Sequence, residues 1–127
     1  MIVGIGVDIV ELDRMARSMK QPRFLMRLLT DAEYEMVQKY PLPRQIEFVS
    51  GRFAAKEAYA KAIGTGIAHG LSWRHIEILP DETGRPVMTA PFSGRIHVSI
   101  SHSSAYAVAQ VILEEEGQHV SSKSNRD

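Results

Sequence analysis

The hydrophobic pattern of the chain begins with a strand. Residues 2–10 form a continuous run of β-favouring residues, and the two-residue period of a strand places the larger apolar ones on one face. These residues are Val3, Ile5, Val7 and Ile9. The other face carries Gly4, Gly6 and Asp8. Because the two glycines have no side chain, we expect another part of the chain to pack close to this second face.

Helical patterns follow this strand. A mixed helical stretch comes directly after it, and Thr30 and Glu33 then form a capping-box pattern that begins a helix ending before Pro41. Pro43 suits a first helical position, and helix-forming sequence runs from there to Gly64, which is typical of a C-terminal cap. We expect this last segment to be the longest helix.

Two pairs of short β-like runs follow the long helix. One pair covers residues 76–79 and 86–89, and the other covers residues 95–100 and 106–113. Each pair is typical of a hairpin. A strand, then helices, then two hairpins predict an α+β fold in which a mostly antiparallel sheet packs on the long helix.

Length and composition indicate one domain. The chain has 127 residues, of which 44% are hydrophobic and 24% charged, as in soluble globular proteins. Residues 117–127 are polar and without periodicity, which predicts a disordered tail after a domain of residues 1–116.

No apolar run is long enough to cross a bilayer and no signal-peptide pattern is present, so we expect a cytoplasmic protein that does not bind membranes. Without cysteine, any metal site must use oxygen or imidazole ligands.

Basic residues are concentrated in one segment, although 15 basic and 15 acidic residues give zero formal net charge. Residues 14–29 contain no acidic residue and five basic ones: Arg14, Arg17, Lys20, Arg23 and Arg27. We call this segment the basic flank. A solvated helix face is the commonest origin of such a pattern. Nucleic acid is a competing partner, but the zero net charge and the lack of a recognised nucleic-acid-binding motif argue against it.

Three charged residues are candidates for chemistry. Asp8 interrupts an apolar strand. It therefore caps the following turn, lies at a solvent-exposed end of the strand, or binds a positively charged group. Glu57 and Lys61 lie four residues apart and therefore on one helical face, which Phe53 shares. Taken alone, that spacing most often marks a surface ion pair.

Two polar segments have the character of phosphate-binding sites. Gly64, Thr65 and Gly66 supply backbone amides beside a helix end, although glycines there more often form only a cap. His102 lies among serines at the end of a predicted strand, where the alternative is an ordinary polar turn. The five histidines have no close metal-ligand spacing, so a zinc site is not expected.

Together these segments resemble a known family, the bacterial holo-acyl-carrier-protein synthases, which are 4′-phosphopantetheinyl transferases. The resemblance covers nearly the whole chain up to the acidic residues near its C-terminus. It is carried by Gly-Ile-Gly-Val-Asp-Ile at 4–9 with Arg14, Arg-Phe-Ala-Ala-Lys-Glu-Ala at 52–58, Lys-Ala at 61–62, Gly-Thr-Gly at 64–66, Gly-Arg-Pro at 84–86 and His-Val-Ser-Ile-Ser-His-Ser at 97–103. Each piece alone is weak, but their combination in this order is highly specific.

The resemblance implies a magnesium-dependent transfer of 4′-phosphopantetheine from coenzyme A to a serine of apo acyl carrier protein, a step of fatty acid biosynthesis. It implies that Asp8 and Glu57 bind the magnesium ion and that Lys61 faces the coenzyme A phosphates, all three being catalytic. The residues implied to line the nucleotide portion of coenzyme A are Arg52, Gly64, Thr65, Gly66, Pro86 and His102. The implied assembly is a homotrimer of the small type, with coenzyme A bound between neighbouring subunits.

The carrier protein expected from the resemblance is acidic, which suits the basic flank. Its basic residues alternate with apolar ones, a mixture fitted to an acidic helix. The residues expected to contact the carrier are Arg14, Arg17, Arg23, Phe24 and Arg27.

Several alternatives stay open from the sequence. The proton of the attacking serine could pass to Glu57 or to a water bound to the metal. A metal-dependent hydrolase of nucleotides or of coenzyme A would have a similar site, and a non-catalytic trimer could bind acidic proteins or nucleotides. The set of Asp8, Glu57 and Lys61 has little reason to exist in such a binding protein. The conformation of residues 89–94 and the range of accepted carriers and acylated coenzyme A substrates are not fixed by the pattern.

Overall fold

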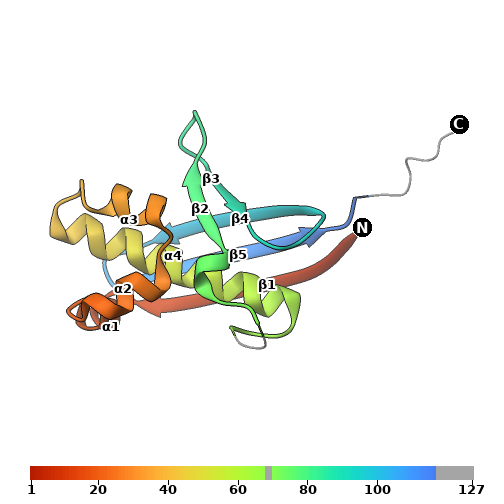
Figure 1. Ribbon diagram of the computed structural model, residues 1–127. Coiled ribbons are helices and arrows are strands. Elements are labelled where there is room, and N and C mark those ends of the chain that lie inside the picture. The colour runs from red at the N-terminus through yellow and green to blue at the C-terminus, as the bar shows by residue number, and fades with distance from the viewer. Residues whose placement is uncertain (68–69, 117–127) are drawn as a thin grey trace, which may run out of the picture.

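Three strands form the base of the structure, a computed structural model that describes residues 1–67 and 70–116 (Figure 1). They are antiparallel and lie in the order β1 (Ile2–Glu11), β5 (Tyr106–Glu114), β4 (Arg95–His102). The register pairs Asp8 with Ala109 and Ala109 with Ile100, so these three residues form one row across the sheet. β4 and β5 are the second predicted hairpin, which is confirmed.

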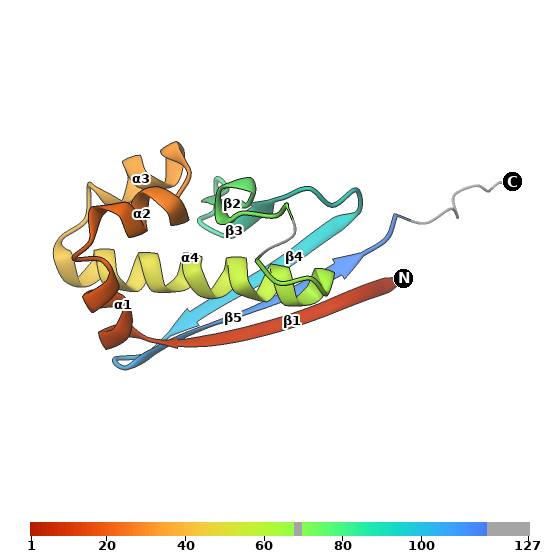
Figure 2. The same ribbon diagram turned by 60° about the horizontal axis from the view of Figure 1, so that its bottom comes forward.

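The longest helix, α4 (Leu42–Ile63), lies across one face of this sheet (Figure 2). It begins one residue before the predicted Pro43, because Pro41 takes the N-cap position. It ends as predicted at Gly64, whose φ of 96° is the left-handed conformation that favours glycine, and the Gly64 N–H donates to the Ala60 carbonyl at 3.0 Å. None of the helices in the described residues is long and apolar enough to cross a membrane.

The two glycines of β1 allow α4 to approach the strand closely. A Cβ atom added at Gly6 would lie 1.9 Å from the Ala58 carbonyl oxygen, and one at Gly4 would lie 2.3 Å from the Ala62 carbonyl oxygen. No side chain fits in that space. The expectation that something packs against this face of β1 is therefore confirmed, and α4 is the element that does so.

A further layer covers α4 on the side away from the sheet (Figure 2). It consists of α2 (Pro22–Leu28), α3 (Asp31–Val37), β2 (Glu77–Pro80) and β3 (Pro86–Thr89), while α1 (Leu12–Ser18) packs on α4 after the end of β1. β2 and β3 pair as the first predicted hairpin. The capping box of Thr30 and Glu33 is present at α3. The separate helix α2 was not predicted, because Pro22 reads as a break although it occupies a first-turn position.

A fully buried ion pair joins α4 to the outer layer. Lys56 Nζ lies 2.6 Å from Glu33 Oε1 and donates to the Leu28 carbonyl at 2.7 Å. Glu33 Oε2 accepts from the Ile78 N–H at 2.7 Å. Burial lowers the pKa of Lys56 from its ordinary value, and the charge of Glu33 opposes that shift. Because removing one partner would leave a buried charge without compensation, this pair fixes the relative positions of α2, α3, α4 and β2.

The face of the sheet opposite α4 is covered by no other part of the described chain (Figure 2), and it is apolar over β1 and the start of β5, whereas β4 exposes polar side chains there. Its exposed apolar side chains are between 36% and 63% accessible: Val3, Ile5, Val7, Ile9, Tyr106 and Val108. An uncovered apolar patch of this kind is typical of an interface with another protein chain. The tail predicted over residues 117–127 lies outside the described residues.

Candidate active site

Asp8 lies on the face of β1 that packs against α4, where Lys61 reaches it. Lys61 Nζ donates to Asp8 Oδ1 at 2.8 Å and to the Val7 carbonyl at 3.0 Å. The Asp8 side chain is 17% exposed and that of Lys61 54%. Of the alternatives left open by the sequence, the structure thus shows Asp8 bound to a positive charge. The Lys61 amine, which is the more accessible of the two groups, can still reach a bound anion.

Glu57 lies one helical turn before Lys61 on α4 but has a different partner. Its Oε2 atom accepts a hydrogen bond from Trp73 Nε1 at 2.8 Å. The surface ion pair between Glu57 and Lys61 that their spacing favoured is therefore not formed among the described residues. Phe53 shares this helix face as predicted, since its ring lies 5.7 Å from that of Trp73.

The chemistry of this donor set fits magnesium. Asp8 and Glu57 supply carboxylate oxygens; Asp8 is bonded to Lys61, and Glu57 lies one helical turn before Lys61. In the part of the chain that the structure describes, no group of three or more His, Cys, Asp or Glu side chains is placed to hold a metal ion. Magnesium commonly uses one or two carboxylates and keeps several waters or substrate phosphates, whereas zinc needs more protein ligands.

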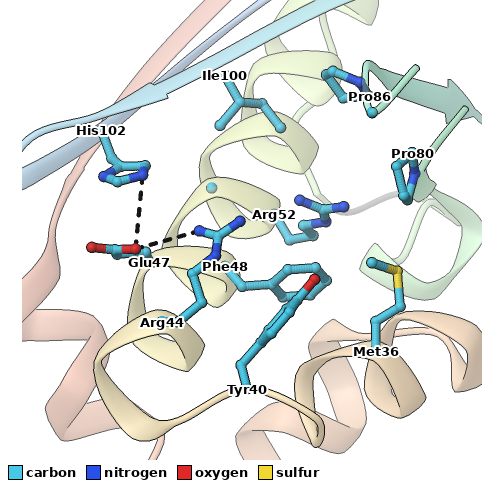
Figure 3. A pocket seen from close by; sticks show the side chains of 12 residues that line it. Met36, Tyr40, Arg44, Glu47, Phe48, Arg52, Pro80, Pro86, Ile100 and His102 are labelled. Carbon is cyan, nitrogen blue, oxygen red and sulfur yellow. Dashed lines mark hydrogen bonds and ion pairs between the residues drawn. The ribbon is translucent and has the colours of Figure 1, made fainter. Parts of the chain in front are cut away.

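A cavity of about 350 Å³ lies against the N-terminal half of α4 (Figure 3). Arg52 from α4, Pro86 from β3 and His102 from β4 line it together. Half of the residues predicted for the nucleotide portion of coenzyme A are thus brought to one place. Tyr40 and Phe48 supply an aromatic wall, with ring centroids 5.6 Å apart.

Arg52 is the most constrained cation of this cavity. It is only 9% exposed, and its guanidinium lies 3.9 Å over the Phe48 ring. Its Nη2 atom donates to the Ile78 carbonyl at 3.0 Å, while Nε has no hydrogen-bond partner among the described residues. Burial lowers the pKa of Arg52 to about 10, so it stays charged at neutral pH. A buried cation with a free donor is suited to an anionic or polar ligand.

The mouth of this cavity carries further charge. Glu47 Oε1 lies 3.8 Å from His102 Nε2 and 3.4 Å from Arg44 Nη1 (Figure 3). Arg44 also lies 5.3 Å over the Tyr40 ring. Four of these lining residues were not predicted from the sequence: Tyr40, Arg44, Glu47 and Phe48. The four-residue spacing of Tyr40, Arg44, Phe48 and Arg52, which places them on one side of the chain, was the available signal.

The structure places the predicted site residues in separate groups. Arg52 and Lys61 are nine residues apart on α4, so their side chains leave the helix on opposite sides, about 14 Å apart along its axis. Thr65, after the C-terminal end of α4, lines a different cavity with Tyr59 and Ile63. Within one chain, the segment of Gly64, Thr65 and Gly66 is therefore not brought together with Arg52, Pro86 and His102.

The basic flank forms α1 and α2 and lies beside Glu57. Its arginines are exposed, and no salt bridge found in the described residues uses them: Arg14, Arg17, Arg23 and Arg27. Phe24 is half-buried and packs 6.3 Å from Phe53, over which Arg14 lies at 6.0 Å. A groove of about 600 Å³ is lined both by Arg27 and by Glu57. A partner held on the flank would thus have access to Glu57.

Comparison with known proteins identifies the family. A sequence model of the 4′-phosphopantetheinyl transferase superfamily matches residues 4–114. The holo-[acyl-carrier-protein] synthase of Exiguobacterium sp. AT1b is 92% identical over 122 residues, 96% of this chain and 100% of that protein. That of Anoxybacillus flavithermus is 60% identical over 116 residues, 90% of this chain and 97% of that protein.

Solved structures agree with the sequence comparison. The Bacillus anthracis holo-(acyl-carrier-protein) synthase in complex with CoA (3′,5′-ADP) superposes with a TM-score of 0.88 at 46% identity, over 91% of this chain and 99% of that one. The Helicobacter pylori enzyme in complex with coenzyme A gives 0.77 at 29% identity, over 87% and 99%. The chain therefore belongs to the holo-[acyl-carrier-protein] synthases of the 4′-phosphopantetheinyl transferase superfamily.

Proposed function

We propose that the chain transfers 4′-phosphopantetheine from coenzyme A to a serine of apo acyl carrier protein in the cytoplasm. The serine oxygen forms a bond to the phosphorus that carries the pantetheine arm, and the bond from that phosphorus to adenosine 3′,5′-bisphosphate breaks. The serine loses its proton, and the leaving group departs with the electron pair of the broken bond. The observation that carries this proposal is the contact of Lys61 with Asp8, which joins candidate charged groups of α4 and β1.

Asp8 and Glu57 would hold a magnesium ion in this reaction. When bound, the ion supplies positive charge that neutralises the pyrophosphate and its developing negative charge. Lys61 adds a fixed cation: its exposed amine binds a phosphate oxygen and stabilises charge that grows as the phosphorus–oxygen bond breaks. Glu57 lines the groove next to the flank, and this supports the proposal that the serine proton passes to its carboxylate, directly or through water.

We infer a homotrimer with the site between subunits from two observations. The outer face of the sheet exposes the apolar side chains of β1 and β5, which a neighbouring subunit would cover. Arg52 and Lys61 lie on opposite sides of α4, so one ligand cannot readily contact both within a single chain. A neighbour that brings its Arg52 cavity to the Lys61 side would join the two groups around one coenzyme A molecule.

The basic flank would hold the carrier protein. Its exposed arginines have no acidic partner within the described residues, and Phe24 and the exposed Met26 lie among them. Such a surface attracts an acidic helix by charge and adds apolar contact. The groove that joins Arg27 to Glu57 gives the serine of a bound carrier a route to the reacting phosphorus.

Release of adenosine 3′,5′-bisphosphate tests this function against its rival. The protein is incubated with coenzyme A and magnesium, with and without apo carrier, and the nucleotide is quantified by chromatography. A transferase releases it only when a carrier with its serine is present, and a carrier with serine replaced by alanine gives none. Release at equal rates without carrier would instead show a hydrolase of coenzyme A.

A further inference from the structure

We propose that Trp73 is a positioning residue for Glu57, and that its indole N–H fixes the orientation in which the Glu57 carboxylate binds the metal ion. This role rests on the magnesium site proposed above. Trp73 Nε1 donates to Glu57 Oε2 at 2.8 Å. The other carboxylate oxygen, Oε1, accepts no hydrogen bond from the described residues, and Glu57 lines an open groove, so this oxygen is available to the ion.

The turn that carries Trp73 is held in place by its neighbours. Trp73 begins the short 3-10 helix η1 (Trp73–His75), which follows the segment after α4. The next residue, Arg74, donates to Asp31 Oδ1 at 3.1 Å and to the Met26 carbonyl at 3.3 Å. Ile76, just beyond the turn, is fully buried in the core. The backbone beside the indole is therefore anchored in the core by Ile76 and also contacts α2 and α3 at the surface, independently of Glu57.

The indole ring itself packs against two phenylalanines, which also contact each other. Its centroid lies 5.7 Å from that of Phe53 and 6.4 Å from that of Phe24, the latter nearly edge-on. Phe53 precedes Glu57 by four residues on the same face of α4. The contributions of ring packing and of the hydrogen bond can therefore be measured separately. A phenylalanine in place of Trp73 keeps most of the ring packing but has no N–H to donate to Glu57.

The orientation of the Glu57 carboxylate matters because magnesium tolerates little deviation in the geometry of its ligands. It requires near-ideal octahedral geometry, and with only two protein carboxylates each must be aimed correctly. Glu57 is only partly buried, so its rotatable bonds lose entropy when it binds an ion, and a hydrogen bond that restricts the side chain beforehand reduces this loss. Replacing outer partners of metal ligands typically weakens metal binding or activity about 10- to 100-fold.

The first test compares Trp73→Phe with Phe24→Leu, using Mn²⁺ as the probe because the same carboxylate ligands suit it. Free Mn²⁺ is measured by electron paramagnetic resonance during titration of each full-length protein. Trp73→Phe should raise the Mn²⁺ dissociation constant at least tenfold, and the magnesium concentration for half-maximal transfer by a similar factor. The carrier KM should change less than twofold. Phe24→Leu disturbs the ring packing but keeps the N–H, so its dissociation constant should change less than threefold.

The second test needs no variant of Trp73. Trp73 is the only tryptophan of the chain, so intrinsic fluorescence reports on this position alone. Mn²⁺ should alter its emission in the unmutated protein with the same half-saturation as the resonance titration. Glu57→Gln keeps an oxygen that can accept the indole N–H but removes the charged ligand, and should abolish the metal response.

The outcomes of these tests distinguish a failure of the role of Trp73 from a failure of the proposed magnesium site on which it rests. Mn²⁺ binding that is equal in Trp73→Phe and the unmutated protein would overturn the role of Trp73 alone. Equal losses in Trp73→Phe and Phe24→Leu would assign the effect to packing and also overturn it. If the unmutated protein binds no Mn²⁺ and shows no fluorescence response, the metal assignment itself fails, and the role of Trp73 fails with it.

Discussion

Lys61 contributes both to the candidate site and to the packing of α4 on β1, because its amine extends from α4 and binds Asp8 of β1. The contact is half-exposed, and exposed ion pairs contribute little to stability. The same cation next to a transferring phosphoryl group acts in a less hydrated setting, where its charge counts for more. We therefore propose that Lys61 acts in catalysis and not in stabilising the fold.

Replacing Lys61 by methionine separates these two roles. The variant keeps the length of the side chain and loses its charge, so kcat should fall at least tenfold, equivalent to roughly 1.4 kcal/mol of barrier. The melting temperature should change by less than about 2 °C. Steady-state kinetics and thermal unfolding provide both values. A normal kcat with a lowered melting temperature would show that Lys61 stabilises the fold and does not act in catalysis.

Sequence spacing identified some site residues and not others, for a physical reason. Glu57 and Lys61 were found because residues four apart share a helix face. The partner of Glu57 is Trp73, and the partner of Lys56 is Glu33; both pairs join different elements of the fold. No local periodicity reports such contacts, since they depend on how the elements pack.

At the scale of elements, the contact between β1 and α4 decides the architecture around the site. Gly6→Ala would place a methyl group against the Ala58 carbonyl, where backbone and not a flexible side chain must move. The free energy of unfolding should fall by at least about 2 kcal/mol. Urea denaturation measures this change. An unfolding free energy within about 0.5 kcal/mol of the unmutated value would mean that helix and strand lie farther apart than described.

The basic flank is a separate element-level feature, and its effect should be confined to carrier binding. Arg14→Glu combined with Arg23→Glu should raise the carrier KM at least tenfold and flatten its dependence on ionic strength, because exposed charges mainly govern encounter. The affinity for coenzyme A should stay nearly constant. Kinetics at several salt concentrations and a coenzyme A titration measure these quantities.

Two controls sharpen the flank experiment. Arg95→Glu reverses an exposed charge at the start of β4, at the other end of the sheet from α1, and should change the carrier KM less than twofold. A carrier with reversed charges should recover part of the activity lost in the double variant. Equal loss of coenzyme A and carrier binding would place these arginines in the nucleotide site instead.

Elements with strong local signals were predictable, whereas their partners were not. The capping box of α3, the long α4 with its glycine cap, and both hairpins each follow from a few adjacent residues. The pairing of β1 with β5, the first strand with the last, joins segments about a hundred residues apart and has no local signature. The exposure of the apolar face of β1 likewise could not be predicted from the sequence. It follows from the packing of α4 on the opposite face, which carries the two glycines.

At the scale of the whole molecule, the proposed trimer completes the site. Ile5 is 60% exposed on the outer face of the sheet, and Ile5→Glu should prevent association by placing a charge in the interface. Sedimentation should then show monomers, with transfer lost and circular dichroism unchanged. Full activity in a monomeric Ile5→Glu protein would contradict the shared site.

Mixing of variants checks the same claim without breaking the assembly. Asp8→Ala and Arg52→Ala would each be inactive alone, because each removes one half of every site. Mixed trimers contain some interfaces with both halves intact, so mixing should restore part of the activity. Variants that stay inactive after exchange of subunits would indicate that both groups serve one chain.

The most direct measurement of the central claim is the mass of an apo carrier protein after incubation with this protein, coenzyme A and magnesium. Intact-protein mass spectrometry should show the addition of one phosphopantetheine group on the carrier serine. A chelator should prevent the addition, and so should Asp8→Ala or Glu57→Ala in a folded protein. An unchanged carrier mass while coenzyme A is consumed would contradict the account, as would chelator-sensitive transfer that persists at a normal rate in both variants.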